Sequence, residues 1–246
     1  MDGRDSLGGL PRWAAAMAAV ALAVATGSAG PAAAQSEPVV VVELYTAQGC
    51  SSCPPSDDLL ATLARDERVA ALALHVDYWD YIGWADSFAR AEFTKRQKDY
   101  ARAAGTRSMF TPQMIVGGID RVAGTRPAEV DAFIDAHLGL DRPVELELKR
   151  EGDAVLIDAT ARAALPSPLM VQMVRYDPEE TVSIERGENA GLTVAYHNIV
   201  TDWTVLGEWA GSEPLRMKAA DVGDGPLVVI LQEKGPGLIV AAARLR

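Results

Sequence analysis

The chain has 246 residues, a formal net charge of −11 at pH 7, 49% hydrophobic residues and 23% charged residues. This length and hydrophobic content allow one large or two small domains with a real core, and they exclude a disordered chain. The acidic balance argues against a basic face for nucleic acid or anionic lipid, so we expect no nucleic-acid partner.

The first 34 residues have the pattern of a secretory signal peptide. Arg4 and Arg12 flank a polar start, residues 13–24 are rich in Ala, Val, Leu and Met, and small residues end at Ala34. An uncleaved membrane anchor is the alternative, but the apolar run is short and is followed by glycines and a proline. We therefore expect a periplasmic or secreted protein that begins at Gln35, has no membrane anchor and lies in an oxidising compartment.

The two cysteines of the chain, Cys50 and Cys53, lie between a predicted strand and a predicted helix. β-Branched residues at 39–45 indicate a buried strand, and leucines at 59, 60 and 63 recur at helical spacing. Two intervening residues let the sulfurs come within bonding distance, and a helix start favours the thiolate. This pattern indicates a reversible dithiol. A structural disulfide is the alternative, although a bridge across so small a loop removes little entropy from the unfolded chain.

The residues after the second cysteine set the start of the helix. Proline tolerates only the first helical turn, so Pro54 and Pro55 favour a helix with Ser56 as its N-cap. Asp57 and Asp58 would complement that helix start but would oppose a nearby thiolate by like-charge repulsion. We therefore expect a first cysteine that is less acidic than those of the strongest dithiol oxidants.

A second buried strand is predicted at residues 69–76, parallel to the first strand through a right-handed crossover. This pairing would bring His75, Tyr78 and Trp79 to the sheet edge that carries the cysteines. Residues 78–84 hold four of the eleven Trp and Tyr residues in the chain. They form either a surface platform for a substrate or a lid over the core.

An amphipathic helix is predicted at residues 86–104, with Arg96 on its solvated face. The next loop enters a strand through Thr111-Pro112, and this X-Pro bond is a candidate for the cis isomer. Two glycines at 117 and 118 predict a hairpin turn, and a last helix is expected at residues 126–137.

From residue 143 the apolar pattern changes to period two, which is typical of strands. Residues 143–246 therefore predict a small all-β domain, a sandwich or a partial barrel. We expect Trp203 and Trp209 in its core and His197 buried with a hydrogen bond. Residues 185–191 form a turn that could face the thiol site.

The predicted order is strand, CxxC, helix, strand, helix, Thr-Pro, hairpin and helix, which resembles the thioredoxin fold over residues 39–139. The motifs CSSCPPSD, HVDYWDYIGW, TPQMIVGG and RGENAG are more closely similar to a secreted bacterial family catalogued as domain of unknown function 1223. The resemblance implies an α/β thioredoxin-like domain at residues 35–142, followed by the all-β domain at 143–246.

The resemblance to thioredoxins also implies a role for individual residues. Cys50 would be the attacking thiolate, Cys53 the resolving thiol, and Pro112 the cis-proline packed against them. Glu43 is the nearest match to the buried acid that moves the proton of the resolving cysteine, unless its face of the strand is solvated. The expected substrate-binding residues are Thr111, Tyr78 and Trp79.

Three functions fit these residues. The first is a thiol-disulfide oxidoreductase that needs no cofactor and acts on protein or peptide thiols and disulfides of the cell envelope. The second is a periplasmic copper-binding or copper-delivery protein that holds Cu(I) with Cys50, Cys53 and His75, although such chaperones usually have a longer cysteine spacing. The third is a non-catalytic binding module with a structural disulfide. No GxSxG, Walker or HExxH motif indicates a hydrolase or nucleotide site.

Overall fold

The computed structural model describes residues 39–221 and 225–245, so the predicted signal peptide and Gln35 lie outside the described residues. The elements are β1 (Val40–Thr46), α1 (Pro54–Leu63), β2 (Val69–His75), the 3-10 helix η1 (Asp77–Ile82), α2 (Ala91–Ala103), β3 (Gln113–Val116), β4 (Asp120–Ala123), α3 (Pro127–Leu138), β5 (Val144–Arg150), β6 (Ala154–Ala161), β7 (Leu169–Ser183), β8 (Thr193–Trp209), β9 (Leu215–Ala220), β10 (Leu227–Glu233) and β11 (Ile239–Leu245).

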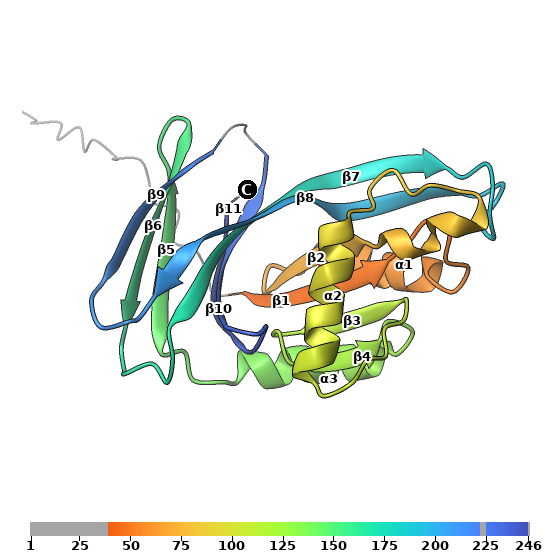
Figure 1. Ribbon diagram of the computed structural model, residues 1–246. Helices are drawn as coiled ribbons and strands as arrows, with labels where there is room; N and C mark the ends of the chain where they lie inside the picture. The colour runs from red at the N-terminus through yellow and green to blue at the C-terminus, as the bar shows by residue number, and fades with distance from the viewer. Residues whose placement is uncertain (1–38, 222–224, 246) are drawn as a thin grey trace, which may run out of the picture. The chain divides into compact units, whose positions relative to one another are not determined.

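Across the described residues, eight strands form one mixed sheet in the order β11-β10-β7-β8-β2-β1-β3-β4 (Figure 1). β1 and β2 pair in parallel, with Thr46 opposite His75, which confirms the predicted crossover. β3 and β4 continue the sheet as an antiparallel hairpin beside β1. On the other side, β8 lies parallel to β2, with Ala73 opposite Ile199.

A separate all-β domain after residue 142 is not confirmed. β7, β8, β10 and β11 extend the sheet that β1 to β4 begin, whereas β5, β6 and β9 form a second sheet of three strands. The free edge of β2 would otherwise present unpaired backbone groups, and β8 covers it. The Asn198 side chain adds a hydrogen bond to the Ala71 carbonyl at 2.9 Å.

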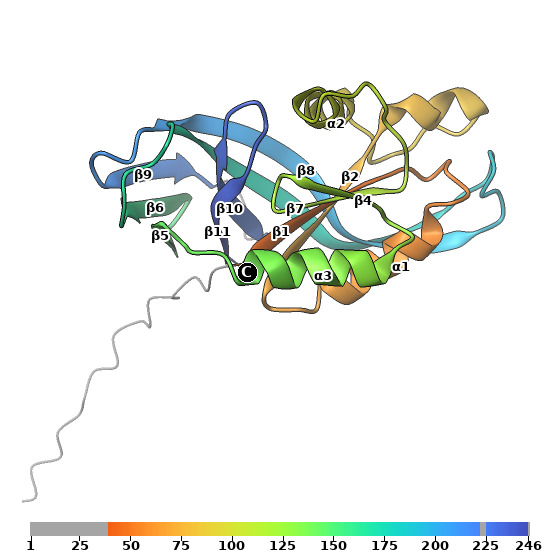
Figure 2. The same ribbon diagram turned by 90° about the horizontal axis from the view of Figure 1, so that it is seen from below.

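Helices cover both faces of the large sheet. Figure 2 shows α2 on one face and α1 and α3 on the other. Because strand side chains alternate, Val41 and Tyr45 pack with Phe93 of α2, whereas Val42 and Leu44 pack towards α1 and α3. A third core lies between the three-stranded sheet and the end of the large sheet that contains β7, β10 and β11.

Three local predictions differ from the structure. The helix predicted from Asp86 begins at Ala91, because Asp86 is buried in other contacts that the next section describes. His197 is only half-buried and lies 3.5 Å from Glu179 on the neighbouring strand. Trp209 is buried as expected, but Trp203 is half-buried. Within residues 39–221 and 225–245, no helix is long and apolar enough to cross a membrane.

Candidate functional site

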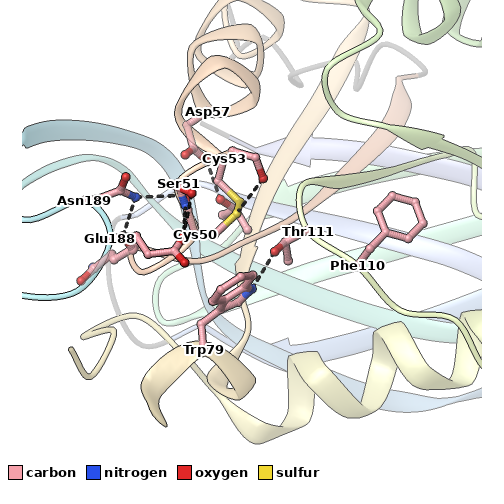
Figure 3. Close-up of a disulfide and its surroundings, with 12 residues drawn as sticks. Cys50, Ser51, Cys53, Asp57, Trp79, Phe110, Thr111, Glu188 and Asn189 are labelled. Atoms are coloured by element: carbon pink, nitrogen blue, oxygen red, sulfur yellow. Dashed lines mark hydrogen bonds between the residues drawn. A yellow bond between two sulfur atoms is a disulfide. The ribbon is translucent and has the colours of Figure 1, made fainter. Parts of the chain in front are cut away.

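Cys50 and Cys53 form a disulfide where the chain passes from β1 to α1 (Figure 3). The prediction of Ser56 as N-cap is wrong: α1 begins at Pro54, and Cys53 is its N-cap. Prolines fit the first helical positions because their missing N–H groups would have no intrahelical partner there. The Cys53 carbonyl still accepts the Ser56 and Asp57 N–H groups at 2.8 and 3.1 Å.

The disulfide is covered, although the residues between its cysteines are not. Cys50 and Cys53 are both 0% exposed. Ser51 and Ser52 are exposed. A partner sulfur therefore cannot reach the disulfide unless a covering segment moves.

The Pro112 loop lies on one side of the disulfide. The Thr111-Pro112 peptide bond is cis, as predicted. A Cβ on Gly124 would come within 2.6 Å of Ser56 Oγ and 3.2 Å of Pro112 Cβ, so glycine lets this loop approach the start of α1. On the same side, the half-buried Trp79 donates a hydrogen bond from Nε1 to Thr111 Oγ1 at 2.7 Å (Figure 3).

Tyr78 is half-buried and donates a hydrogen bond to Gln97 Oε1 of α2 at 3.2 Å. This contact holds η1 against α2. Tyr78 and Trp79 therefore anchor a short helix beside the disulfide, and their expected contact with a substrate stays a prediction. Tyr81 of the same helix is 82% exposed.

The loop between β7 and β8, residues 184–192, covers the other side of the disulfide, and we call it the capping loop. Asn189 Nδ2 donates hydrogen bonds to the carbonyls of Gln48 and Cys50 at 2.8 and 2.9 Å. Glu188 Oε2 accepts a hydrogen bond from Ser51 Oγ at 2.6 Å (Figure 3). Gly187, with φ of 81°, makes the turn that these contacts require. The predicted turn at 185–191 therefore does face the cysteines.

Glu43 does not lie on a solvated strand face, and its expected role in moving the proton of Cys53 stays a prediction. Its carboxylate is fully buried and accepts hydrogen bonds from Arg96, Tyr45 and Tyr100 at 2.6 to 2.9 Å. The prediction that Arg96 lies on the solvated face of α2 is wrong, because its side chain is 13% exposed and pairs with Glu43. Arg96 also lies over the ring of Trp203, at 3.8 Å from the centroid.

Burial lowers the pKa of the Arg96 guanidinium, but Glu43, Tyr100 and Tyr45 together raise it, so the net shift of the pKa of Arg96 is upward. Burial also raises the pKa of Tyr45 and of Tyr100, and Glu43 adds to both shifts. Both phenols therefore remain hydrogen-bond donors. Under α2, Glu43 and Arg96 therefore form a buried ion pair in which both carboxylate oxygens accept hydrogen bonds.

Asp57 is the carboxyl group that the fold places next to Cys53. It lies one helical turn after Cys53, is 5% exposed, and accepts a hydrogen bond from Thr46 Oγ1 at 2.8 Å. Burial raises the pKa of Asp57 to about 7, whereas the charge of His75 and the Thr46 hydrogen bond oppose the rise. The sequence indicated Asp57 only as a helix-start residue. Its i+4 spacing from Cys53 was the signal that could have identified it.

His75 lies at the end of β2, as predicted, but it does not join the cysteines in a metal site. Its Nδ1 lies 2.7 Å from Asp86 Oδ2. Within the part of the chain that the structure describes, no three His, Cys, Asp or Glu side chains form a cluster that could hold a metal ion. The alternative ligand set of Cys50, Cys53 and His75 is therefore not assembled in the disulfide form.

The fold and this site define a mixed α/β protein with a CxxC disulfide at a strand-to-helix junction. The chain belongs to the family described as Protein of unknown function (DUF1223), whose profile matches residues 41–232.

Comparison with known proteins gives two solved structures and no match among curated proteins. A crystal structure of a protein from Agrobacterium tumefaciens is similar at 36% identity with a TM-score of 0.74, over 85% of this chain and 95% of that one. HBP35 of Porphyromonas gingivalis is similar at 15% identity with a TM-score of 0.60, over 85% of this chain and 74% of that one. The second likeness concerns the fold alone.

Proposed function

We propose that the protein is an exported thiol-disulfide oxidoreductase that acts through Cys50 and Cys53 on thiols and disulfides of proteins or peptides. One geometry carries the proposal: the Cys50–Cys53 disulfide lies at a helix start, and the Pro112 loop closely approaches that helix start. The strand order β2-β1-β3-β4, with helices on both faces, resembles that of thioredoxin-like proteins and supports the same reading.

The chemistry is two successive thiol exchanges. The Cys50 thiolate attacks one sulfur of a partner disulfide, which forms a mixed disulfide and releases the other partner sulfur as a thiolate. Cys53 then attacks Cys50 Sγ and releases the second partner thiolate. The cysteine pair is oxidised by two electrons, and the partner disulfide is reduced to two thiols. The reverse sequence oxidises a partner dithiol.

The burial of both cysteines restricts the partner. The capping loop holds the Cys50 carbonyl through Asn189 and the Ser51 hydroxyl through Glu188. A rigid protein surface cannot reach a sulfur that is 0% exposed. A flexible peptide segment, admitted when the capping loop moves aside, is the partner that this geometry favours.

Trapping with a cysteine-containing peptide disulfide tests the function. Cys53→Ser should keep the peptide covalently bound to Cys50, whereas Cys50→Ser should trap little, because only the first cysteine attacks the partner. Pro112→Ala should prolong the mixed disulfide of the otherwise unchanged protein. Each adduct is measured by mass spectrometry under non-reducing conditions.

Two outcomes would overturn the proposal. If reduction of the disulfide unfolded the protein cooperatively at ambient temperature, the bridge would be a structural staple. If both cysteine variants trapped nothing and lost Cu(I) affinity to a similar degree, the cysteines would be metal ligands.

A further inference from the structure

Asp57 presents an open oxygen on the α1 face of the sheet. Its Oδ1 accepts the Thr46 hydrogen bond, but its Oδ2 is buried and has no hydrogen-bond partner among the described residues. Asp57 and Cys53 are four residues apart, so their side chains project from the same side of α1. Buried polar atoms without a partner are rare, and this one requires an explanation.

His75 presents a second open atom in the same cluster. Asp86 Oδ2 accepts the Gln48 N–H at 2.7 Å, and Asp86 Oδ1 accepts the Phe88 N–H at 2.9 Å. His75 Nδ1 lies 2.7 Å from Asp86 Oδ2, and because a carboxylate oxygen only accepts, this contact orients the imidazole with Nδ1 as the donor. The other ring nitrogen, Nε2, is buried without a partner among the described residues.

The charged and titratable groups around Asp57 come from four elements. His75 comes from β2, Asp86 from the segment after η1, Asp58 from α1 itself, and Tyr196 from β8. His75 favours the Asp57 carboxylate, whereas Asp58 and Asp86 oppose it. Burial raises the pKa of Tyr196, and Asp57 and Asp86 add to the shift, so this phenol stays neutral.

We infer that Asp57 Oδ2 takes the proton of Cys53 when the mixed disulfide is resolved, and that His75, oriented by Asp86, is the positioning residue for the carboxylate. This inference rests on the proposed oxidoreductase function. It assigns to Asp57 of α1 the proton transfer that the sequence predicted for Glu43. A group that titrates near neutral pH suits such a transfer in both directions.

The resolving step then balances. In the mixed disulfide, Cys50 Sγ is bonded to the partner sulfur and Cys53 is a thiol. The Cys53 proton moves to Asp57 Oδ2, and the Cys53 thiolate attacks Cys50 Sγ. The partner leaves as a thiolate and takes a proton from water. When the disulfide is reduced by a partner thiolate, Asp57 returns its proton to the departing Cys53 thiolate.

The test is the reaction of reduced protein with glutathione disulfide, stopped with acid and followed by mass spectrometry between about pH 5 and pH 9. Asp57→Asn should form the mixed disulfide within about twofold of the wild-type rate but resolve it about a hundredfold more slowly at pH 8. The rise in the wild-type resolving rate near pH 7 should be absent. Asp58→Asn, at the exposed neighbouring residue, removes only a charge that opposes the Asp57 carboxylate, so both steps should stay within about twofold of the wild-type rates at pH 8 and the rise in the resolving rate should remain.

His75→Gln tests whether His75 acts on the Asp57 carboxylate. A purely structural role of His75 would not change the pH at which the resolving rate rises. The substitution removes the charge that favours the Asp57 carboxylate, so the rise in the resolving rate should move to higher pH. Wild-type resolving kinetics in Asp57→Asn, with the rise near pH 7 intact, would overturn the inference. An equal effect of Asp58→Asn would also overturn it.

Failure of the inference and failure of the function are distinguishable. A stable Cys53→Ser adduct with normal resolution by Asp57→Asn removes the role of Asp57 but keeps the oxidoreductase. If no variant, including Cys53→Ser, forms a mixed disulfide, both the inference and the proposed function are wrong.

If Asp57→Asn does not fold, infrared difference spectra of the wild-type dithiol and disulfide states replace this test. A buried carboxyl band that disappears as the pH rises through 7 supports the inference, and its absence overturns it.

Discussion

Glu43 and Asp57 are two buried carboxylates on opposite faces of one sheet, and they differ in how completely they are paired. Glu43, under α2, accepts hydrogen bonds from Arg96, Tyr45 and Tyr100, and Arg96 supplies the compensating charge. Asp57, on the α1 side, accepts the Thr46 hydrogen bond and keeps a buried oxygen without a partner among the described residues.

In our interpretation, this difference in pairing distinguishes Glu43, which stabilises the fold, from Asp57, which can accept and release a proton. Arg96 supplies the counter-charge of Glu43, so removing either partner would leave the other charge buried and uncompensated. Asp57 has no charged hydrogen-bond partner among the described residues, and burial raises its pKa to about 7 although His75 opposes the rise. Burial of an acid near a CxxC motif is therefore not enough to identify a proton acceptor. The number and charge of the hydrogen-bond partners of the acid determine whether it can accept a proton.

The largest effect should come from breaking the complete pair. Arg96→Met leaves the Glu43 carboxylate buried without a counter-charge, so we expect the free energy of unfolding to fall by about 3 to 5 kcal/mol. Urea unfolding of the oxidised protein at neutral pH measures this loss. Lys95→Met is the matched control, because Lys95 is the preceding residue of α2 and its side chain is 73% exposed in a pair with Asp99. That control should lose less than about 1 kcal/mol. Equal losses would mean that Glu43 is not held by Arg96.

Removing the Asp57 carboxylate should have a smaller effect on the free energy of unfolding, and of opposite sign. The native pKa of Asp57, about 7, lies above its ordinary value of 3.8, so the native state binds more protons than the unfolded state between these pH values. The free energy of unfolding therefore falls as the pH rises through this window, by up to roughly 4 kcal/mol.

Asp57→Asn should remove this pH dependence. Compared with the wild type, the oxidised variant should be more stable at pH 8, by up to roughly 4 kcal/mol, and about equally stable below pH 4. Unfolding curves at a series of pH values measure the difference. Parallel pH profiles for the two proteins would contradict this prediction, because they would show that the native pKa of Asp57 is not raised.

The smallest change in stability, with a clear kinetic consequence, should come from the capping loop. Asn189→Ala removes the hydrogen bonds to the Gln48 and Cys50 carbonyls, which should cost about 1 to 3 kcal/mol. Because the loop then opens more often, reduction of the disulfide by tris(2-carboxyethyl)phosphine should be several-fold faster. Ser183→Ala, which removes an exposed hydroxyl contact with Thr193 on the same hairpin, is the control. Unchanged reduction in the Asn189 variant would show that another segment limits access to the sulfurs.

The local elements and the cysteine pair could be predicted from the amino-acid sequence. β-Branched runs, leucines at helical spacing and the Gly117-Gly118 turn predicted β1, α1, β2 and the β3–β4 hairpin, because each depends on neighbours a few residues apart. The spacing of Cys50 and Cys53 predicted their disulfide for the same reason.

The surroundings of that pair depend on the tertiary fold, because those contacts join residues far apart in the chain. Arg96 looked like a surface charge in the helical pattern of α2 and became buried because Glu43, 53 residues away, faces it. β8 lies beside β2, and the loop before β8 reaches Ser51 across 137 residues. Local periodicity carries no information about contacts between distant residues. It could therefore predict neither the partners of the two buried carboxylates nor the position of the capping loop over the disulfide.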